Sequence, residues 1–313
     1  QEQLTRWLNS MESGELFLLA ARDPEAGNRL AGSRQPRLQR SEALQDGRVD
    51  GIRFSTRPDT VTAHRLEILK AFPVATVELG AQSMDDQVLQ SALRGHTAAD
   101  TATAVKHLKV AGLEIGLQMM VGLPGDNPDK ALASGRGIAD LKPDFVRIYP
   151  TLVLADSRLA KWYTQGRYTP LGLEEAVELT ARLYLLFKQK KISVVRMGLQ
   201  ASKGLDQGEQ ILAGPYHPAF GHLVYARIFL DKVLNHLKSM DENPSKILSV
   251  RVHPRNVSRM QGLQGHNLKY LQAHYNLAQV KVIPDPSVAL DGLVWYTVAA
   301  LAPAPRRGRP PSG

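Results

Sequence analysis

Polar side chains that could contact a ligand follow several short apolar runs of the chain. They are Ser55, Thr56, Arg57, Gln82, Ser83, Gln118, Arg147 and Tyr149. In parallel α/β proteins, functional side chains gather where strands end and loops begin. This set can hold a zwitterion and a ribose by hydrogen bonds, but it has no carboxylate pair and no nucleophile–base dyad. Any one of these residues is also compatible with a structural cap or turn; together they indicate a binding site.

The elements that must position these residues follow a regular pattern. Apolar runs rich in β-branched residues lie at 51–56, 74–80, 114–124, 144–150 and 191–199, and helical stretches separate them. This alternation predicts a parallel sheet covered by helices. Repeated βα units favour an α/β fold, closed as a partial barrel or open as a doubly wound sheet.

Two helices carry clear end signals. Thr97 and Asp100 predict a helix start, and Gly112 predicts its end, since glycine tolerates the left-handed conformation there. A second helix has acidic residues near 174–175 and basic residues at 188–191, which complements the helix dipole.

The pattern changes after Leu199. A long apolar helix is predicted over about 219–237, followed by a half-buried strand of the antiparallel type at 247–252. Further strands are predicted at 280–283 and 294–298. Together they indicate a small C-terminal α+β module.

Composition excludes several classes of protein. The chain has 313 residues, 43% of them hydrophobic, and no cysteine. It therefore offers no disulfide, thiolate nucleophile, cysteine-bound zinc or cysteine-bound iron–sulfur cluster. No apolar run approaches the ~18 residues of a membrane span. We expect a soluble, cytoplasmic protein without a membrane partner.

The charge is unevenly distributed. Residues 181–313 contain 18 Lys and Arg against 7 Asp and Glu, a balance of +11, whereas residues 1–180 contain 21 and 23. A basic C-terminal third indicates a polyanionic partner, with RNA as the obvious candidate. A solvated basic face that only promotes solubility explains the same asymmetry equally well.

Residues 77–126 resemble the radical S-adenosylmethionine (SAM) enzymes. The motifs Gly-Ala-Gln-Ser, Arg-Gly-His-Thr and Val-Gly-Leu-Pro-Gly occur there in the order and spacing of that family. STRPD at 55–59 and VRIYPTLVL at 146–154 extend the resemblance, which covers about 47–298. The sequence is most similar to the branch that contains the elongator-complex catalytic subunit and the oxygen-independent coproporphyrinogen oxidases.

The resemblance implies an architecture and a chemistry. It predicts a partial TIM-type (βα) barrel at 47–200 and a C-terminal extension domain at 201–298. In the family, SAM lies across the strand ends, and a [4Fe-4S] cluster cleaves it to a 5′-deoxyadenosyl radical that abstracts hydrogen from the substrate. The adenine is expected near Leu123.

The resemblance also implies roles for five polar residues. Ser55 and Arg57 match the strand-end positions that contact the methionine or ribose part of SAM. Gln82 and Arg94 match other polar contacts to this cofactor. Gln118 stands where relatives often place an aspartate that binds the ribose.

Two features of the family are missing. The sequence lacks the Cys-x-x-x-Cys-x-x-Cys loop that holds the cluster, and no Gly-Gly strand end precedes Gly47. Residues 21–46 contain no Val, Ile, Phe, Tyr or Trp. We expect 1–46 to be disordered or translated in a shifted frame, and 299–313 to be a disordered tail; a genuine disordered insertion at 21–46 is the alternative. The chain is then a fragment, inactive as given.

Three functions remain open. The first is a radical SAM enzyme, or the remnant of one, that modifies RNA or tRNA. The second is a non-catalytic protein that binds SAM or RNA without the cluster. The third is an ordinary TIM-like metabolic enzyme, which the strand ends support least because they carry no hydrolytic or aldol-type constellation.

Overall fold

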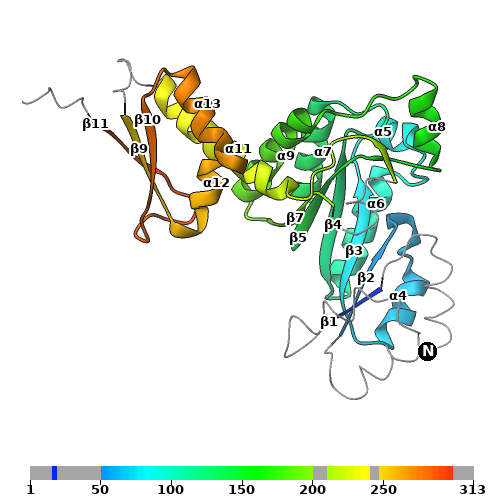
Figure 1. Cartoon of the computed structure of the whole chain (residues 1–313). Helices are drawn as coiled ribbons and strands as arrows, with labels where there is room; N and C mark the ends of the chain where they lie inside the picture. Colours follow the sequence, from blue (N-terminus) through cyan, green and yellow to red (C-terminus); the bar gives the residue numbers. More distant parts are fainter. Residues whose placement is uncertain (1–15, 20–50, 200–209, 240–246, 299–313) are drawn as a thin grey trace, which may run out of the picture. The chain divides into compact units, whose positions relative to one another are not determined.

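The computed structural model describes residues 16–19, 51–199, 210–239 and 247–298, which fall into two compact units (Figure 1). Unit 1 comprises Gln1–Pro218 and unit 2 comprises Ala219–Gly313. The expectations for 1–15, 20–46 and 299–313 lie outside the described residues. Residues 16–19, which belong to the segment expected to be disordered, form a strand.

Unit 1 contains a six-stranded sheet in the order β1-β2-β3-β4-β5-β7. The strands are β1 (Leu16–Leu19), β2 (Gly51–Thr56), β3 (Val74–Gln82), β4 (Glu114–Val121), β5 (Phe145–Pro150) and β7 (Ser193–Met197). β2, β3, β4, β5 and β7 are parallel, and β1 pairs antiparallel with β2 at one edge. The predicted parallel α/β sheet is therefore confirmed.

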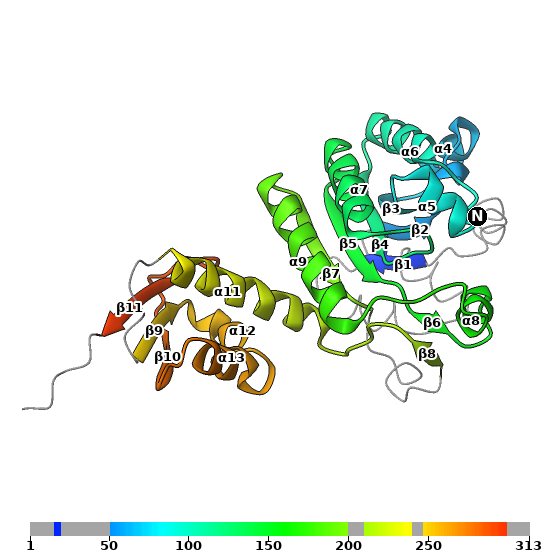
Figure 2. The same cartoon turned by 90° about the horizontal axis from the view of Figure 1, so that it is seen from above.

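Helices cover one face of this sheet (Figure 2). They are α4 (Ala63–Lys70), α5 (Asp86–Ser91), α6 (Ala98–Val110), α7 (Pro128–Asp140) and α9 (Leu173–Gln189). The connections also contain η1 (Pro58–Thr60), α8 (Arg158–Thr164) and a small antiparallel pair, β6 (Val153–Leu154) and β8 (Ile211–Ala213). A doubly wound sheet would have helices on both faces. Among the described elements, the arrangement is that of a barrel wall.

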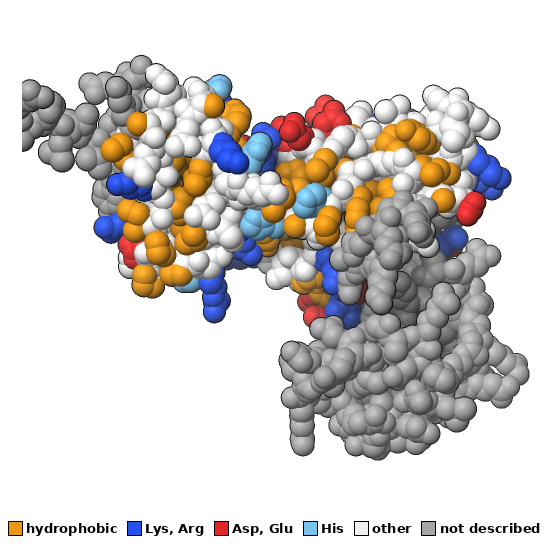
Figure 3. Space-filling view, viewed as in Figure 1, with side chains coloured by type: hydrophobic (Ala, Val, Ile, Leu, Met, Phe, Trp, Pro, Cys, Tyr) orange, Lys and Arg blue, Asp and Glu red, His pale blue; other side chains and the backbone are white. Residues whose placement is uncertain are grey.

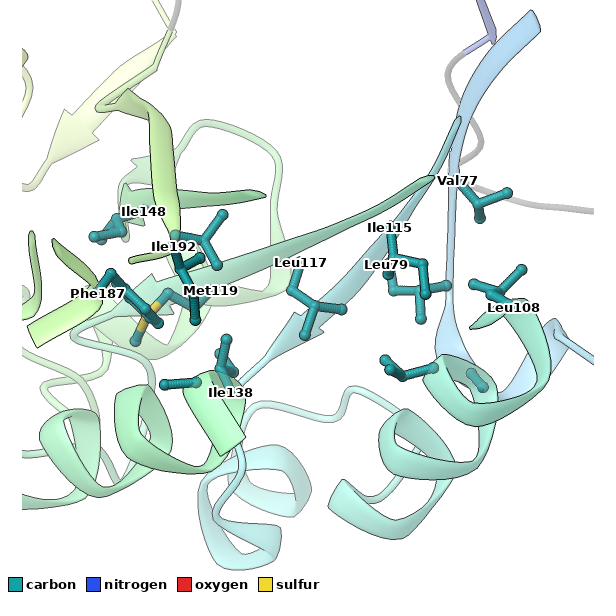
Figure 4. Close-up of a cluster of buried hydrophobic side chains, with 14 of the residues drawn as sticks. Val77, Leu79, Leu108, Ile115, Leu117, Met119, Ile138, Ile148, Phe187 and Ile192 are labelled. Carbon is teal, nitrogen blue, oxygen red and sulfur yellow. The ribbon is translucent and has the colours of Figure 1, made fainter. Parts of the chain in front are cut away.

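The core of unit 1 lies between the sheet and these helices. Figure 4 shows Val77 and Leu79 from β3, and Ile115 and Leu117 from β4, in a cluster with helical side chains such as Leu108. Successive side chains of a strand point to opposite faces. Residues at the alternate positions 78 and 118 therefore face away from this core, and they are polar.

The predicted helix ends are confirmed at α6. Thr97 Oγ1 accepts a hydrogen bond from the Asp100 N–H (3.1 Å), and the Asp100 carboxylate accepts one from the Thr97 N–H (2.8 Å). This reciprocal pair is a capping box. Gly112, just beyond the helix, has φ +71°.

Unit 2 is a small α+β module, as predicted, but it begins at Ala219 and not at residue 201. Its elements are α11 (Phe220–Lys238), β9 (Ile247–Val252), η2 (Pro254–Asn256), α12 (Val257–Gln261), η3 (Leu263–Gly265), α13 (His266–His274), β10 (Gln279–Pro284) and β11 (Val294–Val298). The sheet has the order β10-β9-β11, and the helices pack on one side of it (Figure 1). Leu248, Val250 and Val252 are buried and Arg251 is exposed, as expected for a half-buried strand, but Ser249, which was predicted to share the exposed face with Arg251, is also buried.

The antiparallel prediction for 247–252 was wrong for one neighbour. β9 pairs antiparallel with β11 but parallel with β10. The reason is that two helices connect β9 to β10, and such a crossover returns the chain in its original direction. Among the described residues, we find no helix with the length and apolarity needed to span a membrane.

Candidate functional site

A buried carboxylate organises the polar face of the unit 1 sheet. Glu78 of β3 has no exposed surface and forms ion pairs with Arg53 of β2 and Arg147 of β5. The Arg147 Nε lies 2.9 Å from Glu78 Oε2. Arg147 Nη1 also donates to the Tyr149 hydroxyl (3.3 Å). A buried charge is tolerated only when paired, and Glu78 supplies the negative charge between two guanidinium groups.

Glu78 also fixes the orientation of Gln118 on β4. Gln118 Nε2 donates to Glu78 Oε2 (3.2 Å) and to Ser55 Oγ (3.4 Å). An ionised carboxylate only accepts hydrogen bonds, so the amide group must turn its NH2 toward Glu78. Gln118 Oε1 is then the end that can accept from a ligand, as an aspartate oxygen would.

Gln82 ends β3 with a second acceptor. Its backbone has φ +63°, and the register of β3 against β4 shifts just before it, so that it pairs with Met119. The side chain is 7% exposed, and its Oε1 is buried without a hydrogen-bond partner among the described residues. Nε2 lies over Gly80, where a Cβ would come within 2.6 Å of it.

Two arginines lie close together beyond β2 and α5. Arg57 forms an ion pair with Asp59 (2.8 Å) and donates to the Gly95 carbonyl (3.2 Å). Burial lowers the pKa of Arg94, and the neighbouring charge of Arg57 lowers it further. The Arg94 side chain has no hydrogen-bond or ion-pair partner among the described residues. An anionic group would relieve its unfavourable electrostatics.

The turn after β4 completes this edge of the sheet. Leu123 is 6% exposed, and the turn closes with the Asp126 N–H donating to the Leu123 carbonyl (2.9 Å). The Gly122 N–H donates to Asp126 Oδ2 (3.0 Å), and Tyr168 Oη donates to the Gly122 carbonyl (2.6 Å). Burial raises the pKa of Asp126, and burial together with Asp126 raises the pKa of Tyr168 to about 12. Both groups thus stabilise a tight turn.

The structure connects some of the predicted site residues directly. Ser55 contacts Gln118, and Arg57 lies beside Arg94, whereas Leu123 is at the buried turn. Gln82 ends β3, Ser55 lies one residue before the end of β2, and Gln118 lies inside β4. Arg57 and Leu123 follow β2 and β4, and Arg94 lies in the loop after α5. Their roles toward a cofactor remain predictions.

Two residues of the strand-end set have structural partners. Thr56 Oγ1 and Thr60 Oγ1 lie 2.6 Å apart, and Ser83 Oγ and Ser134 Oγ lie 2.9 Å apart. These contacts support the interpretation of both residues as caps of local structure.

Sequence reasoning missed Arg53 and Glu78. Both lie inside strands, not at their ends, so a search of strand termini passes over them. Alternation was the signal that could have found them, because Arg53 and Ser55 share one face of β2, and Glu78 lies on the same face of the sheet.

Comparisons with known proteins show the family of this chain. The family model described as "Radical SAM superfamily" matches residues 16–134, and that described as "Radical_SAM C-terminal domain" matches residues 143–229. Together they cover more than half of the chain. The chain belongs to the radical SAM superfamily. Most of unit 2 follows the end of both matches.

Its relatives indicate the elongator-like branch of that superfamily. This radical SAM chain is 35% identical over 144 residues to the tRNA uridine(34) acetyltransferase of Dehalococcoides mccartyi, covering 45% of the chain and 31% of that protein. It is 30% identical over 139 residues to Elongator complex protein 3 of Saccharomyces cerevisiae, covering 44% and 25%. The chain thus spans less than a third of these relatives.

A solved structure supports the fold. The archaeal Methanocaldococcus infernus Elp3 with an N-terminus deletion matches with a TM-score of 0.54 and 25% identity, covering 64% of this radical SAM chain and 46% of that one. This likeness confirms the predicted partial TIM-type barrel.

The residues present fit SAM but not the cluster. Gln82 Oε1 and Gln118 Oε1 are acceptors for hydroxyl groups, and Arg94 is a cation suited to a carboxylate. The 313 residues contain no cysteine, and the described part of the chain has no group of three His, Asp or Glu residues that could hold a metal. This chain therefore supplies no ligand set for a [4Fe-4S] cluster.

Proposed function

We propose that this chain is the SAM-binding and RNA-contacting part of an elongator-like, tRNA-modifying radical SAM enzyme. The observation that carries the proposal is the buried Gln82 Oε1, an acceptor without a partner among the described residues, at the strand edge where SAM lies in the family. The names of the relatives and the basic C-terminal third support tRNA as the substrate.

Each side chain has a distinct task in this proposal. Arg94 pairs with the carboxylate of SAM, and Gln82 and Gln118 accept hydrogen bonds from its hydroxyl groups. Leu123 provides an apolar surface beside the adenine. In radical SAM enzymes, SAM bound to a reduced cluster supplies the 5′-deoxyadenosyl radical.

The proposal separates binding from radical formation. Without cysteine ligands, the chain binds SAM but does not cleave it, which makes a non-catalytic SAM- or RNA-binding protein the second candidate function. Anaerobic reconstitution with iron and sulfide tests this separation: we expect no cluster absorbance and no cleavage of SAM. A cluster band accompanied by SAM cleavage would overturn the expectation that the chain is inert.

Calorimetric titration tests the SAM site. Gln82→Leu removes the buried acceptor, and we expect it to weaken binding of SAM by at least ~10-fold, equivalent to ~1.4 kcal/mol. Gln90→Leu makes the same change at an exposed position of α5 and should bind as the unmodified chain does. No binding by the unmodified chain, or equal affinities of the two variants, would refute the assignment.

A further inference from the structure

The loop between α12 and α13 in unit 2 lies within a recognisable arrangement of helices and strands. α12 and α13 are joined by Gly262-Leu263-Gln264-Gly265, and this helical pair connects the adjacent parallel strands β9 and β10. β11 flanks β9 on the other side, and all three helices pack on one face of the sheet. A βααβ core with a Gly-x-x-Gly loop between its helices is the arrangement of the KH module, in which this loop clamps the backbone of four nucleotides.

The shape of this loop requires both glycines. Gly262 has φ +73°, and a Cβ there would come within 2.9 Å of Asn267 Oδ1. Gly265 also has φ +73°, but a Cβ there would meet nothing within 4 Å. The inner side of the loop is therefore closely packed, whereas its outer side at Gly265 presents bare backbone to open space.

A buried asparagine holds the loop in place. Asn267 is 3% exposed, and its Nδ2 donates to the carbonyls of Ala226 on α11 (2.9 Å) and Met260 on α12 (3.1 Å). One side chain thus ties the start of α13 to both other helices. The loop backbone is fixed before any ligand arrives, which lowers the entropy cost of binding.

The side chains next to the loop suit a nucleic acid. Leu263 is 39% exposed, and Gln264 is exposed beside it. His266, Lys269 and Tyr270 follow at spacings that place them on one face of α13, and all three are exposed. Tyr270 stacks on His274, with ring centroids 5.4 Å apart. This surface combines a cation, aromatic rings and open backbone, which are the groups that bind single strands.

The charge of unit 2 favours the same ligand. Its described residues contain eight Lys and Arg against three Asp and Glu. Two of the acids are engaged in ion pairs, Asp231 with Arg227 and Asp285 with Arg251. Figure 3 shows basic side chains spread over the visible face of unit 2, with fewer acidic ones between them.

We propose that unit 2 is a single-stranded RNA-binding module whose 262–265 loop holds the sugar–phosphate backbone. The bases lie against the exposed face of α13, where Tyr270 and His274 offer stacking surfaces. The inference deepens the proposed function and rests on its RNA role, because it names the site by which the chain contacts RNA.

A double substitution in the loop tests the site in the full chain. Leu263→Asp/Gln264→Asp adds negative charge where the backbone of RNA would lie, and both positions are exposed, so the fold should persist. Leu185→Asp/Gln189→Asp on α9 is the matched control, because Leu185 is 37% exposed and the charge change is identical. Circular dichroism and thermal midpoints verify that both variants are folded.

The probe is a fluorescein-labelled, single-stranded RNA of 12 randomised nucleotides, followed by fluorescence anisotropy. We expect the loop variant to bind at least ~10-fold more weakly than the unmodified chain, and the α9 variant to remain within ~2-fold. Equal losses in both variants would show only a general charge effect and overturn the site. Equal affinity for the duplex of the same length, or tighter binding of the equivalent DNA strand, would also overturn it.

This outcome is separate from that of the SAM titration. A chain that binds the RNA through the loop but binds no SAM refutes the proposed cofactor role and leaves the RNA module supported. A chain that binds SAM but no single-stranded RNA refutes the RNA module and leaves the SAM role of the proposed function supported.

Discussion

Glu78 shows how one buried residue can organise the polar face of a sheet. It holds Arg53 and Arg147 and turns the amide of Gln118. A buried ion pair gives little net stability relative to apolar residues of the same volume, but removing one partner leaves an uncompensated charge. Removing the Glu78 side chain should therefore destabilise the fold by more than the net stability that its ion pairs contribute.

We expect Glu78→Ala to lower the free energy of unfolding by about 3–5 kcal/mol, because two guanidinium groups would remain buried without a counter-charge. Urea unfolding followed by circular dichroism measures this change. Glu67→Ala is the control: Glu67 is 69% exposed in its pair with Lys70, and such surface pairs contribute about 0–1 kcal/mol. Similar losses in the two variants would contradict the role of Glu78 as the central counter-charge.

Among the residues of this network, Gln118 and Arg147 were predicted from the sequence, whereas Glu78, which contacts both of them, was not. Gln118 and Arg147 follow from their positions in strands. The role of Glu78 cannot be predicted in this way, because its carboxylate is an isolated polar group within VATVELG. Its partners become evident only when β2, β4 and β5 are aligned with β3. Hydrogen-bond direction, which decides how Gln118 presents its oxygen, depends on contacts across 40 residues of sequence.

Among the elements, α6 is the one whose ends the sequence specifies most fully. Thr97 and Asp100 satisfy each other's backbone N–H groups, and Gly112 allows the chain to leave the helix. These interactions join residues that are close in the sequence, so the sequence alone predicts them. By contrast, the parallel pairing of β9 with β10 depends on how α12 and α13 connect them, which local alternation of apolar residues does not encode.

We expect Thr97→Ala to destabilise unit 1 by about 1 kcal/mol at pH 7, as loss of an N-cap does. The hydrogen bonds with Thr97 hold the pKa of Asp100 below its usual 3.8. A lowered pKa in the folded state gives stability that is present above pH 3.8 and lost as the pH falls through the folded value. Urea unfolding from pH 7 to pH 2.5 should therefore show the two proteins converging in acid.

Thr103→Ala serves as the comparison, because Thr103 is exposed within the same helix and caps nothing. It should be neutral or slightly stabilising, since alanine favours helix more than threonine. A loss equal to that of Thr97→Ala would contradict the capping role.

The whole molecule separates its charge between two units. The basic excess lies in the C-terminal third, whereas the proposed SAM site lies in unit 1. Binding of tRNA should therefore depend on salt through unit 2. We expect the Kd for tRNA to rise at least ~10-fold between 50 and 200 mM salt, because displaced counterions favour binding at low salt.

Lysine substitutions show which unit causes the salt dependence of tRNA binding. Lys269→Gln/Lys281→Gln in unit 2 should reduce the slope of log K against log salt by about 1–2. Lys70→Gln/Lys106→Gln removes the same charge from exposed positions of unit 1 and should leave the slope unchanged. A Kd for tRNA that stays constant with salt, or equal effects of the two pairs, would contradict the assignment of RNA contacts to unit 2.

The two hydrophobic cores do not share residues. The core of unit 1 draws on positions 52–192, and that of unit 2 on positions 229–280. During synthesis, every buried residue of the first core has therefore been added to the chain before any residue of the second. Because domains generally fold as units in the order of translation, the sheet of unit 1 can assemble on the ribosome while unit 2 is still being made.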